Sequence, residues 1–500
     1  MTTGFVASAV EASLVVLASV LLAVPLHAIG WVAEAAALPL VCLGAAAVGL
    51  HLPAPAIVRR LGCCSLRRAP SMGLALGCCS PSLLLCAMAL ANVRAATPAA
   101  PLLRAHLWAL LGCAVQPPLV LLLQPLAASL PWWSAPLLSA LPPLLTLAVA
   151  APEGADPGIT LVSLLTHVAA LAWSTAMVRR SFTLGEAAAL AQGVAALSAD
   201  ALLMTRCTLA AGGPAATPWG HWGRLCTARE PEAMGIEAVL AGGLALTAAA
   251  AAVLAPLRGR ASPSARAALL VGGIALALGG VLLPWLEALV VLAPSLLALA
   301  LAAVVPAFAL LELVRVGALP PLARPLAAFL AAFIDSRDAG TLVLTHIYLL
   351  AGCALPVWLQ SALPPPPPAS RAPLAAAAVR GAPLAGVLVL GVGDAMASLV
   401  GVRFGRTRWP RSRKTLEGSA AAAGSTLLAL LLLLHVSSPD GAPADARTWA
   451  ALAGGTAVAC LLEAATDQID NLFLPVAYQT WLLIAAVLEP WCRDSSCGEG

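Results

Sequence analysis

The stretch Ser419–Val436, SAAAAGSTLLALLLLLHV, contains no charged side chain along its whole length. A transmembrane helix needs about 20 largely apolar residues to cross roughly 30 Å of hydrocarbon, so this stretch predicts a membrane span. Comparable runs recur along the chain and predict about 13–15 transmembrane helices. The expected spans lie near residues 5–25, 36–52, 72–92, 102–124, 133–150, 159–177, 186–205, 236–256, 267–283, 286–311, 340–361, 382–402, 419–436, 449–464 and 472–489.

The composition agrees with a membrane protein. The chain is 61% hydrophobic and 10% charged, whereas soluble domains average about 45–50% and about 25%. Residues 1–10 contain no basic side chain and Glu11 interrupts the first apolar run, so we expect a retained span and not a cleaved signal peptide. The 13 cysteines lack the spacing of a zinc site. The predicted fold class is an all-α, polytopic integral membrane protein, with no nucleic-acid partner.

The polar residues that could form a site are unevenly distributed along the chain. Residues 1–325 predict transmembrane helices of unassigned role, residues 326–490 contain the clustered polar residues, and residues 491–500 form a short polar tail. Five consecutive prolines at 364–368 favour extended polyproline II. We therefore expect residues 362–380 to be a loop between two spans.

The most basic segment of the chain lies between two of the late spans. Six basic side chains fall within residues 403–414, among them Lys414, the only lysine of the protein. Cytoplasmic loops carry an excess of Lys and Arg, which predicts a cytosolic loop. A helix starting near Thr415 adds free N–H groups that favour a phosphate, but no Walker motif occurs. Charge that only sets topology and contacts anionic lipids is the alternative.

Two further polar groups interrupt the apolar spans. Asp394 follows Gly391 and Gly393, with Ser398 one turn further on, and a carboxylate within a span usually faces a site, a partner or water. A buried ion pair that fixes helix packing is the alternative. His346 alone predicts a hydrogen-bonded core histidine, and Asp335 a pairing with nearby Arg337.

A third group is acidic. The spacings of Glu463, Asp467 and Asp470 are four and three, which predicts one stripe of a helix. Carboxylate oxygens suit Mg²⁺, which typically binds one or two carboxylates together with substrate phosphates. A polar helix end in the headgroup region is the alternative.

Taken together, these segments resemble the dolichol kinases, within the wider group of membrane polyprenol and phytol kinases and phosphatidate cytidylyltransferases. The resemblance covers residues 325 to about 485 and rests on the order of its motifs. These are Asp335-Ser-Arg-Asp338, Leu342-Val-Leu-Thr-His-Ile-Tyr-Leu-Leu350, Gly391-Val-Gly-Asp394 with Ala397-Ser398, Arg408-Trp-Pro410, Lys414-Thr415-x-Glu417-Gly418, Leu462-Glu463-Ala464 and Gln468-Ile-Asp-Asn-Leu472 with Pro475.

The resemblance implies an enzyme of the endoplasmic reticulum membrane that phosphorylates dolichol or a related polyprenol. It also implies CTP as phosphate donor, a divalent metal such as Mg²⁺, membrane lipids as surroundings, and a cytosolic CTP-binding segment. That segment comprises Val402, Arg403, Phe404, Gly405, Arg406, Thr407, Arg408, Trp409, Pro410, Arg411, Ser412, Arg413, Lys414, Thr415, Leu416 and Glu417.

On this reading, we expect four catalytic residues: Asp394, Lys414, Asp467 and Asp470, with Asp467 and Asp470 as metal ligands. Supporting roles are expected for Gly391, Gly393, Ser398, Gly418, Glu463, Asn471, Asp335 and His346.

The sequence departs from the family pattern in one place. Relatives often carry an Arg-Lys-x-x-His element before this region, and only Arg266 of it is present here. Two other functions remain open at this point: a lipid cytidylyltransferase that makes a CDP-lipid, and a transporter for an anionic solute. The Trp-Pro and Lys-Thr-x-Glu-Gly elements favour the kinase, and the confinement of charged helices to the last third disfavours transport.

Overall fold

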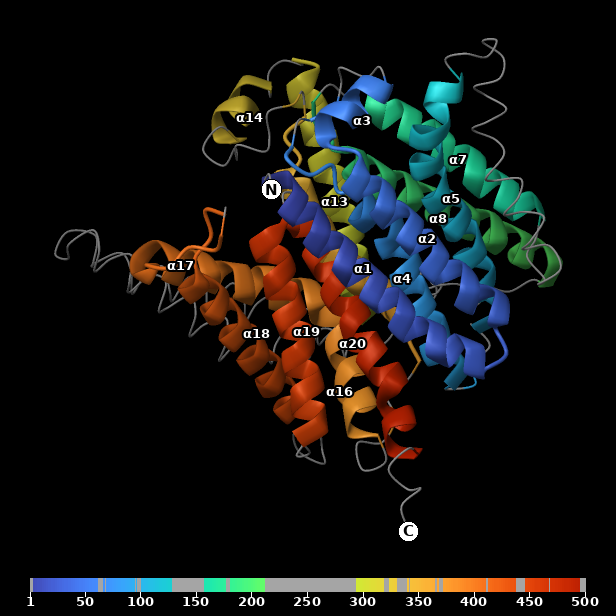
Figure 1. Cartoon of the computed structure of the whole chain (residues 1–500), viewed down its shortest axis with the longest axis vertical. Coiled ribbons are helices and arrows are strands. Elements are labelled where there is room, and N and C mark those ends of the chain that lie inside the picture. Colours follow the sequence, from blue (N-terminus) through green and yellow to red (C-terminus); the bar gives the residue numbers. More distant parts are fainter. Residues whose placement is uncertain are drawn as a thin grey trace.

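The structure is a computed structural model of the whole chain (Figure 1). It describes residues 3–127, 157–211, 294–330, 340–437 and 446–494, apart from short gaps at 62–65, 68, 95, 97–99, 177–179, 319–322, 341, 365–366, 368–371, 411 and 467. Within these ranges the regular structure is helical and contains no strand. The predicted all-α fold class is therefore confirmed.

The helices of the first part are α1 Thr3–Ala28, α2 Val32–His51, α3 Ala54–Leu61, α4 Leu74–Arg94, α5 Ala100–Ala127, α7 Pro157–Ala176, α8 Leu184–Ala211, α13 Pro294–Val316 and α14 Ala323–Leu330. The later helices are α15 Thr345–Trp358, the short 3₁₀ helix η4 Leu359–Ala362, α16 Pro373–Gly381, the 3₁₀ turn η5 Ala382–Leu384, the π-helix η6 Val387–Asp394, α17 Ala395–Phe404, α18 Leu416–Ser437, α19 Ala446–Ala465 and α20 Asp470–Asp494.

Eight of the described helices are long and apolar enough to cross a membrane. They are Gly4–Ala28, Val32–His51, Leu74–Arg94, His106–Leu123, Val387–Phe404, Leu416–His435, Ala446–Ala465 and Asp470–Glu489. Helices are the expected solution in lipid, because every backbone N–H and C=O must find its partner within the segment. The predicted spans at 133–150, 236–256 and 267–283 lie outside the described residues, so the total helix number stays a prediction.

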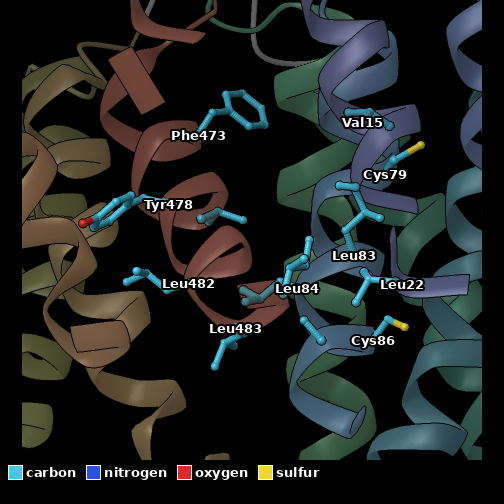
Figure 2. Packing of buried hydrophobic residues seen from close by; sticks show 14 of the residues in the cluster. Val15, Leu22, Cys79, Leu83, Leu84, Cys86, Phe473, Tyr478, Leu482 and Leu483 are labelled. Atoms are coloured by element: carbon cyan, nitrogen blue, oxygen red, sulfur yellow. The ribbon is translucent and has the colours of Figure 1, made fainter. Parts of the chain in front are cut away.

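The first and last parts of the chain share one packed core. Helix α20 packs against α4, and α1 contacts both α19 and α20 (Figure 1). Figure 2 shows side chains of this core on three helices: Phe473, Tyr478, Leu482 and Leu483 on α20, Cys79, Leu83, Leu84 and Cys86 on α4, and Val15 and Leu22 on α1. The N-terminal helices therefore form part of the scaffold that holds the C-terminal ones.

Close helix contacts depend on glycine at several crossings, of which two are examples. A Cβ on Gly77 of α4 would lie 2.0 Å from the carbonyl oxygen of Gly185 in α8, and one on Gly352 of α15 would lie 2.0 Å from that of Asn471 in α20. Lipid chains are as apolar as the helices, so association depends on such tight packing and on interhelical hydrogen bonds.

The loop prediction for residues 362–380 is wrong in its second half. Helix α16 occupies Pro373–Gly381 and continues through η5 into η6 and α17. Pro373 opens the helix, where its missing N–H costs nothing. The carboxylate of Glu489 in α20 accepts hydrogen bonds from the backbone N–H groups of Leu374 (3.4 Å) and Ala375 (2.8 Å). The acceptor for the free N–H groups of this short helix is therefore distant in sequence.

Candidate functional site

The basic segment folds back on itself between α17 and α18. Residues 402–404 are the last turn of α17, so the excursion between the helices runs from Gly405 to Thr415. Arg408 and Thr415 form an antiparallel β-bridge, the N–H of Trp409 donates to the carbonyl of Lys414 (3.0 Å), and the N–H of Leu416 donates to that of Thr407 (2.8 Å). This pairing brings Lys414 back to the start of α18.

Side chains of α18 hold the excursion in place. The Glu417 carboxylate accepts the backbone N–H of Thr407 at 2.9 and 3.2 Å, and the Trp409 indole N–H donates to the Ser419 hydroxyl at 2.9 Å. Thr415 caps α18, because its hydroxyl accepts the N–H of Gly418 at 3.2 Å. Three of the predicted CTP-binding residues, Thr407, Trp409 and Glu417, thus maintain the shape of the loop.

Lys414 joins this loop to two other helices. Its Nζ lies 3.0 Å from Oε1 of Glu463, in the last turn of α19, and 3.4 Å from Oδ2 of Asp470, in the first turn of α20. The side chains are 28%, 8% and 17% exposed, respectively. A half-buried ammonium group thus bridges two carboxylates from separate helices at one end of the bundle.

The prediction that Glu463, Asp467 and Asp470 form one helical stripe is wrong. Helix α19 ends at Ala465 and α20 begins at Asp470, so a turn separates the first carboxylate from the last. The turn nevertheless brings Glu463 and Asp470 to the same Nζ. Asp467 lies outside the described residues, as do Arg411 and Asp335. Glu463, expected only in a supporting role, contacts Lys414 directly.

The predicted carboxylate at 394 lies at the end of the π-helix η6. π-Helical turns are rare and occur frequently at functional sites. The Thr426 hydroxyl of α18 donates to the Leu388 carbonyl at 3.4 Å, which satisfies one backbone group of this segment. Gly393 allows this contact, because a Cβ there would lie 2.5 Å from the Thr426 Oγ1.

Gly393 also connects this segment to the lysine site. A small pocket between η6, α18, α19 and α20 has both Gly393 and Glu463 in its lining. Asp394 itself is half-buried, whereas Ser398 is exposed on α17. The structure thus brings the glycine-containing segment to Glu463.

The remaining arginines of the segment, at 403, 406, 408 and 413, are exposed. The apolar side chains of Val402 and Phe404 next to them are 90% and 61% exposed. Charged and apolar groups in one turn are typical of a membrane–water boundary, where both find a favourable solvent.

The segment with His346 contacts the first turn of α20. His346 lies half-buried in the first turn of α15, and the Asn471 side-chain amide donates to the neighbouring Thr345 carbonyl at 3.5 Å. Glu312 of α13 accepts the N–H of Val343 at 2.5 Å and so fixes the start of α15. Glu312 also pairs with Arg315 in the same helix at 2.6 Å, and its backbone partner at Val343 is distant in sequence, so no local pattern indicates that second contact.

Among the described residues, no group of three or more His, Cys, Asp or Glu side chains forms a metal-binding cluster. Two carboxylates, Glu463 and Asp470, do converge within 3.4 Å of one cation position, the Lys414 Nζ. Mg²⁺ is commonly held by one or two carboxylates and the substrate phosphates. The donor set therefore fits a divalent cation that a phosphorylated substrate helps to coordinate.

These features define a polytopic helical membrane protein with a cationic loop docked on two carboxylates at one end of its bundle. No protein-family model and no solved structure matches the chain.

Curated relatives do match it. The chain is 38% identical over 195 residues to dolichol kinase EVAN of Arabidopsis thaliana (39% of this chain, 32% of the relative) and 42% identical over 178 residues to a human dolichol kinase (36% and 31%). It is 34% identical over 195 residues to a dolichol kinase of Schizosaccharomyces pombe (39% and 35%). The resemblance to dolichol kinases of plants, animals and yeasts is thus confirmed, although the match spans about a third of each relative's length.

Proposed function

We propose that the protein is a dolichol kinase that uses CTP, and that its product is dolichyl phosphate, the lipid carrier for N-glycosylation and related sugar transfers. The observation that carries the proposal is the Lys414 Nζ held 3.0 and 3.4 Å from Glu463 and Asp470. The similarity to curated dolichol kinases supports the lipid alcohol as acceptor. CTP, the location in the endoplasmic reticulum and the cytosolic orientation of the loop are part of the same proposal.

The basic loop binds the triphosphate in this proposal. Phosphoryl transfer depends mainly on positioning and on stabilising the charge that moves toward the leaving group. Lys414 neutralises that charge at the transferring phosphate, because it is the cation fixed between two helices. The exposed arginines at 403, 406, 408 and 413, together with Arg411, supply further donors along the nucleotide. Glu417 keeps the loop in shape through the Thr407 N–H.

Carboxylates provide the second half of the site. Glu463 and Asp470, with Asp467 from the intervening turn, would hold Mg²⁺, which supplies charge neutralisation on the phosphate oxygens when bound. Asp394 comes from a segment that borders the same pocket as Glu463. The dolichol oxygen bonds to the γ-phosphorus of CTP, and CDP leaves. One of these carboxylates accepts the proton of the dolichol hydroxyl during this step.

The test is direct transfer of label. Purified protein in lipid is incubated with dolichol, Mg²⁺ and CTP labelled at the γ-phosphate, with ATP in a parallel reaction. We expect label in the lipid phase with CTP and little with ATP. Label in the lipid from α-labelled CTP would instead establish a nucleotidyl transfer and overturn the kinase. Unlabelled lipid in every reaction, from protein with a cooperative melting transition, would also overturn it.

A further inference from the structure

The turn between Glu463 and Asp470 is held by buried side chains from the N-terminal part of the chain. Residues 466–469 connect α19 to α20, directly before Asp470. Thr466, Gln468 and Ile469 bond to three N-terminal segments: α1, the residues preceding α4, and the start of α8. Figure 1 shows α1 beside α19 and α20 at this end of the molecule.

Glu186 is the first of these contacts and is fully buried. It belongs to a capping box at the start of α8: the Thr183 hydroxyl accepts the Glu186 N–H at 3.3 Å, and the Glu186 carboxylate accepts the Thr183 N–H at 2.9 Å. The other carboxylate oxygen forms an ion pair with Arg67 and accepts the N–H of Ile469 at 3.0 Å. The residue before Asp470 is thereby tied to α8.

Gln468 is the second contact and is also fully buried. Its amide donates to the Ser71 carbonyl at 3.0 Å, and its side-chain oxygen accepts the Thr183 hydroxyl at 2.5 Å. Gly73 makes room for it, because a Cβ there would lie 2.3 Å from the Gln468 amide carbon. The backbone φ of +62° at Gly73 is itself a conformation that favours glycine.

Glu11 is the third contact. This buried carboxylate of α1 accepts the Thr466 hydroxyl at 2.8 Å and the Ser71 hydroxyl at 3.1 Å. Thr466 in turn accepts the Gln468 N–H at 3.1 Å, so the network closes on the turn. Buried polar groups are costly unless satisfied, and a satisfied network fixes one arrangement.

We propose that Glu186, Gln468 and Glu11 are positioning residues that set where Asp470 meets Lys414 and Glu463. The inference rests on the proposed function and gives the N-terminal helices a part in it. Substituting a residue that holds a metal ligand in place typically changes metal affinity or activity about 10–100-fold. The same consequence is expected here, although these side chains do not touch the reacting atoms.

The first test compares two buried ion pairs. Glu186→Gln weakens the pair with Arg67, and the matched control Glu34→Gln weakens a pair with Arg104 (2.5 Å) that joins α2 to α5. Both changes should lower the melting temperature. We expect only Glu186→Gln to raise the Mg²⁺ concentration for half-maximal activity, by about tenfold. Equal Mg²⁺ dependence in the two variants would show that Glu186 only stabilises the fold, and would overturn its positioning role.

The second test uses a milder pair at Thr183. Thr183→Val keeps the side-chain shape but removes the hydroxyl that contacts Gln468 and Glu186, whereas Thr183→Ser retains it. We expect Thr183→Val to reproduce the Mg²⁺ effect of Glu186→Gln and Thr183→Ser to behave as the parent protein. Identical Mg²⁺ dependence for Val and Ser would overturn the proposal.

A readout independent of activity separates this inference from the proposed function. Lys414 is the only lysine, so reductive methylation with ¹³C-formaldehyde gives one lysine resonance, which reports its surroundings. Glu186→Gln and Thr183→Val should shift that resonance and speed the modification, whereas Glu34→Gln should not. A shifted resonance without lipid phosphorylation in the parent protein would retain the positioning network and reject the kinase. An unshifted resonance in protein that does phosphorylate the lipid would reject the positioning network and retain the kinase.

Discussion

Replacing Lys414 tests the site most directly, because its Nζ contacts two carboxylates from different helices. Lys414→Met keeps the length of the side chain and removes the charge. A hydrogen bond to a charged group contributes about 1.5–3 kcal/mol net. The 28% exposure of the lysine side chain places the stability loss at the lower end of that range. Removing one fixed donor to developing charge costs about 2.7–4 kcal/mol in the transition state, or about 10²–10³ in kcat.

The comparison of these magnitudes decides the expected outcome. The stability loss is small beside a typical unfolding free energy of about 5–15 kcal/mol, so Lys414→Met should stay folded in detergent while kcat for lipid phosphorylation falls about 10²–10³-fold. Without the ammonium group, Glu463 and Asp470 repel each other. The melting temperature of the variant should therefore rise more with added Mg²⁺ than that of the parent protein.

The assay is initial-rate transfer of label from CTP to dolichol, beside a thermal melt with and without Mg²⁺. Arg59→Met in α3 is the matched control, because it removes one exposed cation away from the site. Lys414→Arg keeps the charge but offers a planar fork, and we expect it to recover little activity. Turnover within about threefold of the parent protein in Lys414→Met, against the 10² expected, would refute the role of Lys414.

Three further changes test other contacts. Glu417→Ala removes the acceptor of the Thr407 N–H, and the KM for CTP should rise because the loop loses a contact that fixes its shape; an unchanged CTP titration would contradict a loop-holding role. Gly352→Ala places a Cβ 2.0 Å from the Asn471 carbonyl oxygen, and overpacking of this kind costs about 1–3 kcal/mol; a melting temperature equal to that of the parent would argue against this helix crossing. Glu489→Ala leaves the first turn of α16 without its acceptor and should cost about 1 kcal/mol in a thermal melt, as lost caps do; no destabilisation would count against the cap.

Much of the fold could be predicted because hydrophobic length is a local property. The expected spans at 5–25, 102–124, 419–436 and 449–464 all fall within helices of the structure. Helix α16 could not be predicted in this way. It is nine residues long, follows a proline run, and depends on Glu489 more than a hundred residues away.

The site was predicted in composition but not in arrangement. Lys414, Glu463 and Asp470 were all singled out by charge within an apolar chain, and the structure brings them together. The spacing of the carboxylates nevertheless suggested one helix, because residues 466–469 contain no glycine or proline to indicate a break. At this break, Thr466 and Ile469 donate hydrogen bonds to carboxylates of α1 and α8. Of these contacts, only the Thr183-x-x-Glu186 capping box is visible as a sequence pattern. That pattern indicates the start of a helix but not the contact of Glu186 with Ile469.

The geometry explains why a lysine occupies position 414 in a chain whose other cationic side chains are arginines, the seven histidines apart. The planar guanidinium group of arginine matches one carboxylate through two parallel hydrogen bonds. At position 414, two carboxylates approach one nitrogen from the ends of different helices, at 3.0 and 3.4 Å. A compact ammonium with three rotatable donors satisfies both. It can also turn from a carboxylate to a phosphate oxygen without moving the loop, because only its flexible stem needs to rotate. A rigid fork held by either carboxylate would have to release that partner first.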